Sequence, residues 1–206
     1  MAEYALVKKA LKGFLPDCTD SLARILVVAL KTGQISYEEI EDLIGAEDEV
    51  EEVLLMGYSW RLLLPRRSLK TMEWEDRLLI PMPGEIYEIP SVIRELVREA
   101  SRSGRWEPHR AIAALFKQIE GLEGERMPDL VELLAQYAKG AHVTAIQIKR
   151  ACRALDMEDK VDSIIAYLKA GGIVSPALGY LPEAGQRRTP VYELNPSVLP
   201  GYHRSG

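Results

Sequence analysis

Histidines, cysteines and an acidic run are the residues of this sequence that could do catalytic or metal chemistry. His109, His142 and His203 stand in unrelated contexts, and none has metal-ligand spacing with Cys, Asp or Glu. Cys18 and Cys152 lie far apart in the chain, outside any CxxC motif, and two cysteines are too few for a disulfide scaffold. The sequence therefore predicts no metal site, no catalytic residue and no cofactor.

Nucleotide-binding and hydrolase motifs are absent as well. The sequence contains no GxGxxG, no GxxxxGK[ST] and no GxSxG. The acidic run at 47–52 could coordinate a cation, but it lacks the D-x-[DN]-x-[DN]-G pattern of a calcium loop. At the start of a helix its carboxylates interact favourably with the helix dipole. We expect a solvated helix face there, and a protein that is not an enzyme.

Basic residues are distributed unevenly along this acidic chain, whose net charge is −5. Residues 1–125 hold 16 Lys and Arg against 23 Asp and Glu, a net charge of −7. Residues 126–206 hold 10 against 8, a net charge of +2. The overall charge argues against indiscriminate binding of nucleic acid, whereas the C-terminal part has the charge to contact phosphates.

An internal repeat predicts the elements that position these residues. Segments 86–93 and 191–199 share one pattern and differ in length by the single inserted Asn195. Upstream of them, residues 22–40 match 130–148 at a constant offset of 108, and 50–65 match 161–176 at an offset of 111. The sequence therefore predicts two copies of one structural unit.

Each copy predicts three helices followed by a two-stranded hairpin. The capping boxes Ser36/Glu39 and Thr144/Gln147 mark the start of the second helix twice. The predicted helices are 20–32, 37–44 and 48–57 in the first copy, and 128–139, 145–155 and 158–170 in the second. The predicted strands are 61–64 with a return at 77–80 or 86–89, and 173–175 with a return at 191–194. Gly171-Gly172 should end the last helix, because glycine tolerates a left-handed backbone.

This order of elements resembles the winged helix, a variant of helix-turn-helix. The resemblance rests on Lys169-Ala-Gly-Gly-Ile-Val-Ser175 and Val191-Tyr-Glu-Leu-Asn-Pro196. The first copy departs from it by Trp60-Arg61 in place of Gly171-Gly172 and by a longer wing. The resemblance implies a mainly α fold with small β-wings (α+β), in two tandem winged-helix domains.

We expect the first domain at 1–90, with a leading helix at 3–14, and the second at 127–206. A helical linker at 91–126 should join them, with Ser91 capping a helix at 92–102 and Pro108 opening one at 108–120. The apolar positions that the two copies share should be buried. They are Leu22, Ile25, Leu26, Ile40, Leu43, Val50, Val53 and Leu54, then Leu130, Leu133, Leu134, Ile148, Ala151, Val161, Ile164, Ile165 and Leu168.

The winged-helix resemblance implies double-stranded DNA as a partner, contacted by the third helix and the wing. In the first domain that helix carries five carboxylates within 47–52, which would repel phosphates, so it should face away from DNA. The candidate nucleic-acid-binding residues are Lys149, Arg150, Arg153, Lys160, Tyr167, Lys169, Arg187, Arg188, Arg66 and Arg67.

Two functions remain open from the sequence. The first is a DNA-binding transcriptional regulator or DNA-associated factor. The second is a protein interaction or scaffold module of a larger chromosome or transcription assembly, in which Trp60, Leu62, Leu64 and Trp74 would contact a protein partner or a second copy of the chain. The same four residues could instead pack the wing against its own helices.

The sequence predicts a cytoplasmic protein without a membrane-spanning segment. The longest apolar run, 25–30, is far too short to span a bilayer. The N-terminus is amphipathic and punctuated by lysines, so it lacks the continuous apolar region of a signal peptide.

Overall fold

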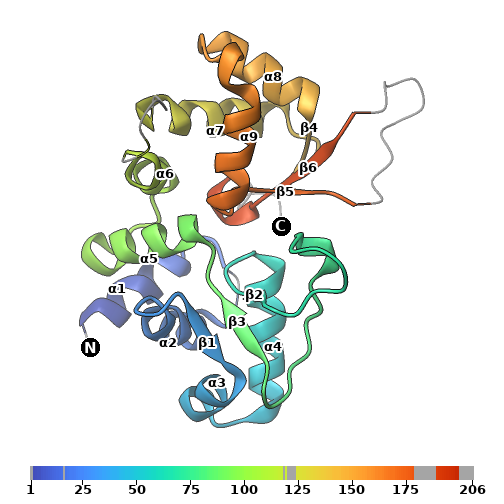
Figure 1. Cartoon of the computed structure of the whole chain (residues 1–206). Helices are drawn as coiled ribbons and strands as arrows, with labels where there is room; N and C mark the ends of the chain where they lie inside the picture. The colour runs from blue at the N-terminus through green and yellow to red at the C-terminus, as the bar shows by residue number, and fades with distance from the viewer. Residues whose placement is uncertain (1, 16, 118, 120–123, 179–188, 200–206) are drawn as a thin grey trace.

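The structure of the protein is a computed structural model that describes residues 2–15, 17–117, 119, 124–178 and 189–199. These residues form a mainly helical protein with two small antiparallel sheets of three strands each, which confirms an α+β fold (Figure 1). Arg187 and Arg188, which the sequence placed in the second wing, lie outside the described residues. No helix within the described residues is long and apolar enough to cross a membrane.

The first half runs from the N-terminus to β3. It contains the helices α1 (Ala2–Leu11), α2 (Thr19–Ala29), α3 (Tyr37–Ile44) and α4 (Glu47–Ser59). Its strands are β1 (Gln34–Ser36), β2 (Leu64–Pro65) and β3 (Ile86–Glu88), and the short 3-10 helix η1 (Trp74–Asp76) lies between the last two. The leading helix therefore ends three residues before the predicted 14, and β3 is the second of the two predicted return strands.

The second half repeats this order after two connecting helices, α5 (Ser91–Ser103) and α6 (Pro108–Phe116). Its helices are α7 (Met127–Tyr137), α8 (Ala145–Ala154) and α9 (Val161–Ala170), and its strands are β4 (His142–Thr144), β5 (Val174–Pro176) and β6 (Val191–Leu194). Three 3-10 helices complete it, namely η2 (Gly124–Arg126), η3 (Glu158–Lys160) and η4 (Pro196–Val198).

Strands β1 and β4 correct the sequence analysis, which predicted no strand between the first and second helices of either copy. The sheet orders are β1-β3-β2 and β4-β6-β5, so each predicted hairpin gains a third strand. Ile35 pairs with Tyr87 in one sheet, and Val143 pairs with Tyr192 in the other, in the same register. A strand of three residues is too short for its alternation of buried and exposed side chains to be recognised in a sequence.

Both predicted capping boxes are confirmed, and they explain why α3 and α8 begin where they do. The Ser36 hydroxyl accepts a hydrogen bond from the Glu39 backbone N–H at 3.2 Å, and the Ser36 N–H donates to the Glu39 carboxylate at 2.9 Å. Thr144 and Gln147 form the same reciprocal pair, at 3.2 and 2.7 Å. The predicted cap at Ser91 is wrong, because Pro90 occupies that position and Ser91 is the first residue of α5.

Most of the predicted core is buried, including Leu54, Ile164 and Leu168. Four predicted positions are only half-buried: Leu43, Leu133, Val161 and Ile165. For Val161 and Ile165 this follows from the packing of α9, which contacts chiefly α8 and β5, whereas α4 also packs against α2. The buried stripe on α9 is therefore narrower than its apolar spacing predicts.

The connecting helices tie the two halves into one packed structure. Helix α5 packs against α1 of the first half, and α6 packs against both α5 and α7 (Figure 1). Helix α6 ends at Phe116, earlier than the predicted 120. Buried side chains of both halves and of the connecting helices belong to one continuous hydrophobic core.

Candidate nucleic-acid interface

Three cations that the sequence singled out come together on one helix. Lys149, Arg150 and Arg153 all lie on α8 with exposed side chains. Arg153 is three residues from Arg150 and four from Lys149, so the three side chains lie next to one another on the helix surface. Figure 1 shows α8 at the end of the molecule that lies away from the first half, so an extended ligand such as a duplex could contact α8 without contacting the first half.

Glu158 of η3 partly neutralises these cations. The Arg153 guanidinium donates from Nε and Nη2 to the two Glu158 oxygens, at 2.7 and 2.6 Å, and Lys149 Nζ lies 3.4 Å from Oε1. The hydrogen bonds from Arg153 are the main reason why the pKa of the Glu158 carboxyl is lowered to about 2. Two cations thus share one carboxylate, and the group keeps a positive charge.

Arg150 is held by a different contact. Its guanidinium lies over the ring of Tyr137, with 5.2 Å to the ring centroid. The negative face of an aromatic ring attracts a guanidinium without neutralising it. We call Lys149, Arg150 and Arg153 the α8 cluster. In it, Arg150 lies over the ring of Tyr137, and the other two cations share Glu158.

The remaining predicted nucleic-acid residues do not join this cluster. Lys160 and Tyr167 are half-buried. Lys169 lies on the other end of the second half, where its ammonium contacts Glu73 of the first half at 3.1 Å. Arg66 and Arg67 are exposed on the first half, where Arg67 contacts the buried Glu85 carboxylate at 2.7 Å.

The corresponding surface of the first half is strongly acidic, as predicted. Between residues 37 and 59, which cover α3 and α4, the chain holds nine Asp and Glu and no Lys or Arg. All five carboxylates of 47–52 are exposed. The pKa of the Tyr37 hydroxyl is raised chiefly by burial and then by nearby carboxylates of α3 and α4, of which Glu41 and Glu47 act most. This surface, the α3–α4 acidic face, would repel phosphates.

Three of the four residues suggested for a protein interface are buried, so they do not form an exposed patch. Leu62 and Leu64 belong to the core of the first half, which is the alternative that the sequence left open. Trp74 is also buried. Trp60 is half-buried, and its ring lies 5.3 Å from that of Phe14.

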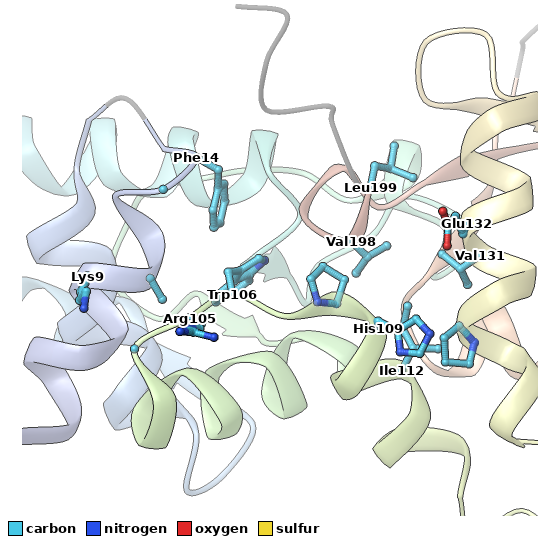
Figure 2. A pocket seen from close by; sticks show the side chains of 15 residues that line it. Lys9, Phe14, Arg105, Trp106, His109, Ile112, Val131, Glu132, Val198 and Leu199 are labelled. Carbon is cyan, nitrogen blue, oxygen red and sulfur yellow. The ribbon is translucent and has the colours of Figure 1, made fainter.

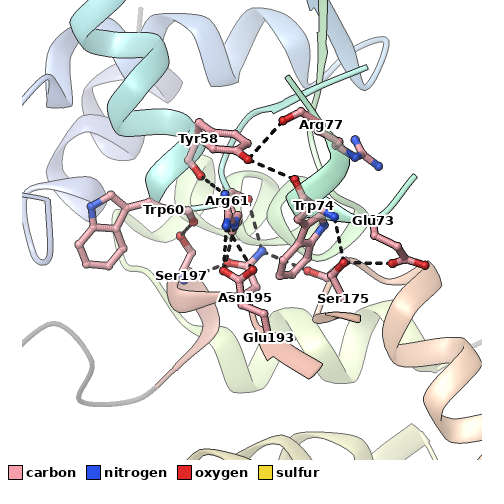
Figure 3. Close-up of polar contacts among 11 residues, drawn as sticks. Tyr58, Trp60, Arg61, Glu73, Trp74, Arg77, Ser175, Glu193, Asn195 and Ser197 are labelled. Carbon is pink, nitrogen blue, oxygen red and sulfur yellow. Dashed lines mark hydrogen bonds and ion pairs between the residues drawn. The ribbon is translucent and has the colours of Figure 1, made fainter. Parts of the chain in front are cut away.

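Trp60 and Trp74 instead mark the contact between the two halves (Figure 3). The Trp74 backbone N–H donates to the Ser175 hydroxyl at 3.0 Å, and the Ser197 hydroxyl donates to the Trp60 carbonyl at 2.5 Å. Between these contacts, the Arg61 guanidinium donates to both carboxylate oxygens of Glu193, at 3.0 and 3.1 Å. About 13% of the Arg61 side chain is exposed, so solvent screens this ion pair only weakly.

Asn195 completes the contact between the halves. It is fully buried, and its amide donates to the carbonyls of Arg61 and Gly172, at 3.3 and 3.1 Å. The sequence analysis assigned no role to Arg61, Glu193 or Asn195. A signal was present, because Trp60-Arg61 and the inserted Asn195 are among the places where the two copies of the repeat differ.

The structure gives no sign of a metal centre in the residues it describes, where no three His, Cys, Asp or Glu side chains are grouped to hold an ion. Cys18 and Cys152 are free thiols. Burial is the main reason why the pKa of each thiol is raised to about 11, which leaves both protonated and unreactive at neutral pH.

Comparison with known proteins yields a family and no nearer relative. A family model matches residues 7–204, which include both halves and the connecting helices, and that family is uncharacterised. No curated protein and no solved structure matches the chain.

Proposed function

The chain belongs to that uncharacterised family, and from the charge of its two halves we propose that it is a non-enzymatic, tandem winged-helix protein that binds double-stranded DNA through its second half. The α8 cluster carries this proposal. In the proposed complex, Lys149, Arg150 and Arg153 contact phosphates, and the α3–α4 acidic face points away from the duplex. A role in transcription or another DNA-associated process would follow.

The winged-helix assignment rests on the repeated order of elements. In each half a helix and a short strand are followed by two further helices and then by two more strands of the same sheet. The last two helices form the pair that helix-turn-helix proteins place against DNA. The proposed domains are 1–90 and 127–206, with 91–126 between them. The contacts through Arg61 and Asn195 would hold the domains in one orientation.

The pairing of Arg153 with Glu158 is compatible with DNA binding. Exposed ion pairs contribute little free energy, so phosphates can replace the carboxylate at small cost. Because each contact is to phosphate, binding should depend on salt and discriminate little between sequences.

The test is fluorescence anisotropy with a labelled random-sequence duplex at low and moderate salt. The double substitution Lys149→Ala with Arg150→Ala should weaken binding about tenfold at low salt and lower the salt slope by about two units, one for each phosphate contact. The matched control is Glu41→Ala with Asp42→Ala, the equivalent positions of the first half. We expect this control to bind as tightly as the parent or slightly more tightly.

A second candidate function is docking of a basic protein partner on the α3–α4 acidic face. The observation that favours it is the absence of cations from residues 37–59, together with Leu55, whose side chain is 58% exposed on α4. If the parent protein does not bind duplex at low salt, DNA binding is excluded and the interaction module becomes the better proposal. Equal effects of the two double variants would also contradict the DNA proposal.

A further inference from the structure

A cavity of about 570 Å³ lies where the two halves meet the connecting helices (Figure 2). Its walls come from α1 and the residues just after it, from the turn between α5 and α6, from α6 and α7, and from residues 198–199 at the end of η4. Its volume falls within the range of pockets that bind small molecules in proteins. The cavity is separate from the α8 cluster, because none of the three cations lines it.

Two aromatic rings and several aliphatic side chains form the body of the cavity. The rings of Phe14 and Trp106 lie 5.1 Å apart at an angle of 44°. The Trp106 Nε1–H donates to the Ser197 carbonyl at 2.9 Å, which fixes the orientation of the indole. Ile112 and Val198 are buried in the opposite walls. An aromatic surface that is held in place without a ligand is preorganised for a planar apolar group.

The charges around the cavity are separated. Lys9 and Arg105 lie at the end near the two rings, and Glu132 lies at the other end (Figure 2). Lys9 and Arg105 are both exposed, and the described part of the chain gives neither of them an ion-pair partner. His109 lies 3.6 Å from Asp129. The aromatic end of the cavity thus carries two cations whose charge is not balanced locally.

We propose that this cavity binds a small aromatic monocarboxylate. The aromatic body of the ligand packs against Phe14 and Trp106, and its carboxylate accepts charge-assisted hydrogen bonds from Lys9 and Arg105. Because the walls come from both halves and from the connecting helices, the bound ligand stabilises their mutual arrangement. The site is independent of DNA binding, and it gives the protein a small-molecule partner.

The experiment is calorimetric titration of the full chain with 1-naphthaleneacetate and with 1-naphthaleneethanol, which has the same rings and no charge. We expect saturable binding of the acid, about tenfold tighter than binding of the alcohol, because hydrogen bonds to charged groups are worth more than neutral ones. In the double variant Lys9→Ala with Arg105→Ala, the acid should lose this advantage and bind like the alcohol.

The matched control is Lys12→Ala with Arg102→Ala, which removes the same charge from the residue after α1 and from α5, at exposed positions that do not line the cavity. The control should keep the preference for the acid. A parent protein that shows no saturable binding of the acid would overturn the proposal. An equal loss of preference in the control would also overturn it, since the effect would then come from net charge. Neither outcome depends on whether the protein binds DNA.

Discussion

Helices α3 and α8 hold equivalent places in the two halves, yet their exposed charges are opposite. Both begin with the same reciprocal capping box. At the offset of 108 residues, Glu41 of the first half corresponds to Lys149 and Asp42 corresponds to Arg150. One backbone arrangement therefore presents carboxylates in one half and cations in the other.

This difference shows which positions the fold constrains. Ile40 and Ile148 are equivalent and both fully buried, because a polar side chain there would lose its solvation. The exposed positions next to them make few contacts that packing could select, so their charge can follow the partner that each surface meets. The shared architecture alone therefore does not indicate a shared partner.

A second comparison concerns the ends of α4 and α9. Arg61 and Gly172 are equivalent at the offset of 111, and both have a left-handed backbone, with φ of 52° and 72°. Gly172 approaches Pro90 so closely that a Cβ atom there would lie 2.5 Å from the proline Cβ. Arg61 has room for a side chain and uses it to reach Glu193. The turn after α9 therefore packs its backbone closely against Pro90, whereas the equivalent turn after α4 supplies the side chain of an ion pair.

The largest effect is expected at Leu54, whose equivalent position in the second half is Ile165. Leu54 is fully buried, so Leu54→Ala should destabilise the protein by about 2–5 kcal/mol through the lost side chain and the cavity left behind. Ile165 is half-buried, so Ile165→Ala should cost less than about 2 kcal/mol, because part of its surface is already in water. Chemical denaturation of both variants measures the free energy of unfolding.

Ile164→Ala provides the control within the second half, because Ile164 is fully buried next to Ile165. It should resemble Leu54→Ala. A cost for Ile165→Ala equal to that for Ile164→Ala would show that the stripe on α9 is as wide as the spacing of its apolar residues predicts.

An intermediate effect is expected at Gly172. The substitution Gly172→Ala should destabilise the protein by about 1–3 kcal/mol, because alanine is strained at a φ of 72° and its Cβ overlaps Pro90. Gly45→Ala is the matched control, since Gly45 has a φ of 87° and open space around the added atom. Thermal or chemical unfolding should show a smaller cost for Gly45→Ala. If the two costs are equal, the contact with Pro90 does not constrain the halves.

The smallest effect is expected at Glu158, the η3 carboxylate that pairs with Lys149 and Arg153 of α8. The substitution Glu158→Gln should tighten DNA binding a few-fold at low salt, because it frees Arg153 and Lys149 and removes one negative charge near the phosphates. The lowered pKa of about 2 keeps Glu158 ionised at neutral pH, so substitution is needed to remove its charge. Anisotropy titrations compare the variant with the parent, and weaker binding would argue against phosphate contacts at the α8 cluster.

The sequence predicted the helices of both halves well because the signals for them are local. Capping boxes fix helix starts through hydrogen bonds between residues three apart, and the bounds of α3 at Tyr37–Ile44 were predicted as observed. The three-residue strands β1 and β4 were missed, since their stability comes from pairing with distant residues. The sequence also brought Lys149, Arg150 and Arg153 together correctly, because they share one helix.

The contact between the halves could not be predicted in the same way. Arg61 and Glu193 are separated by 132 residues, and no spacing rule connects them. The sequence offered Lys169 as a DNA contact, and Trp74 either as a protein contact or as a residue packed under the wing. In the structure Lys169 pairs with Glu73 across the contact, and Trp74 is buried beside Ser175 of the other half. Their roles depend on how two folded halves meet, which is a property of surfaces assembled from several elements.

By itself, the sequence determined the repeated order of helices, the helix starts and the opposite charges of two equivalent surfaces. Each of these follows from interactions within a few residues or from counting charges. Only the tertiary structure decided which apolar residues are fully buried, which cations are paired, and that Asn195 lies at the centre of the contact between the halves. Burial and ion pairing depend on neighbours that are distant in the chain, and those neighbours are defined only when the helices pack.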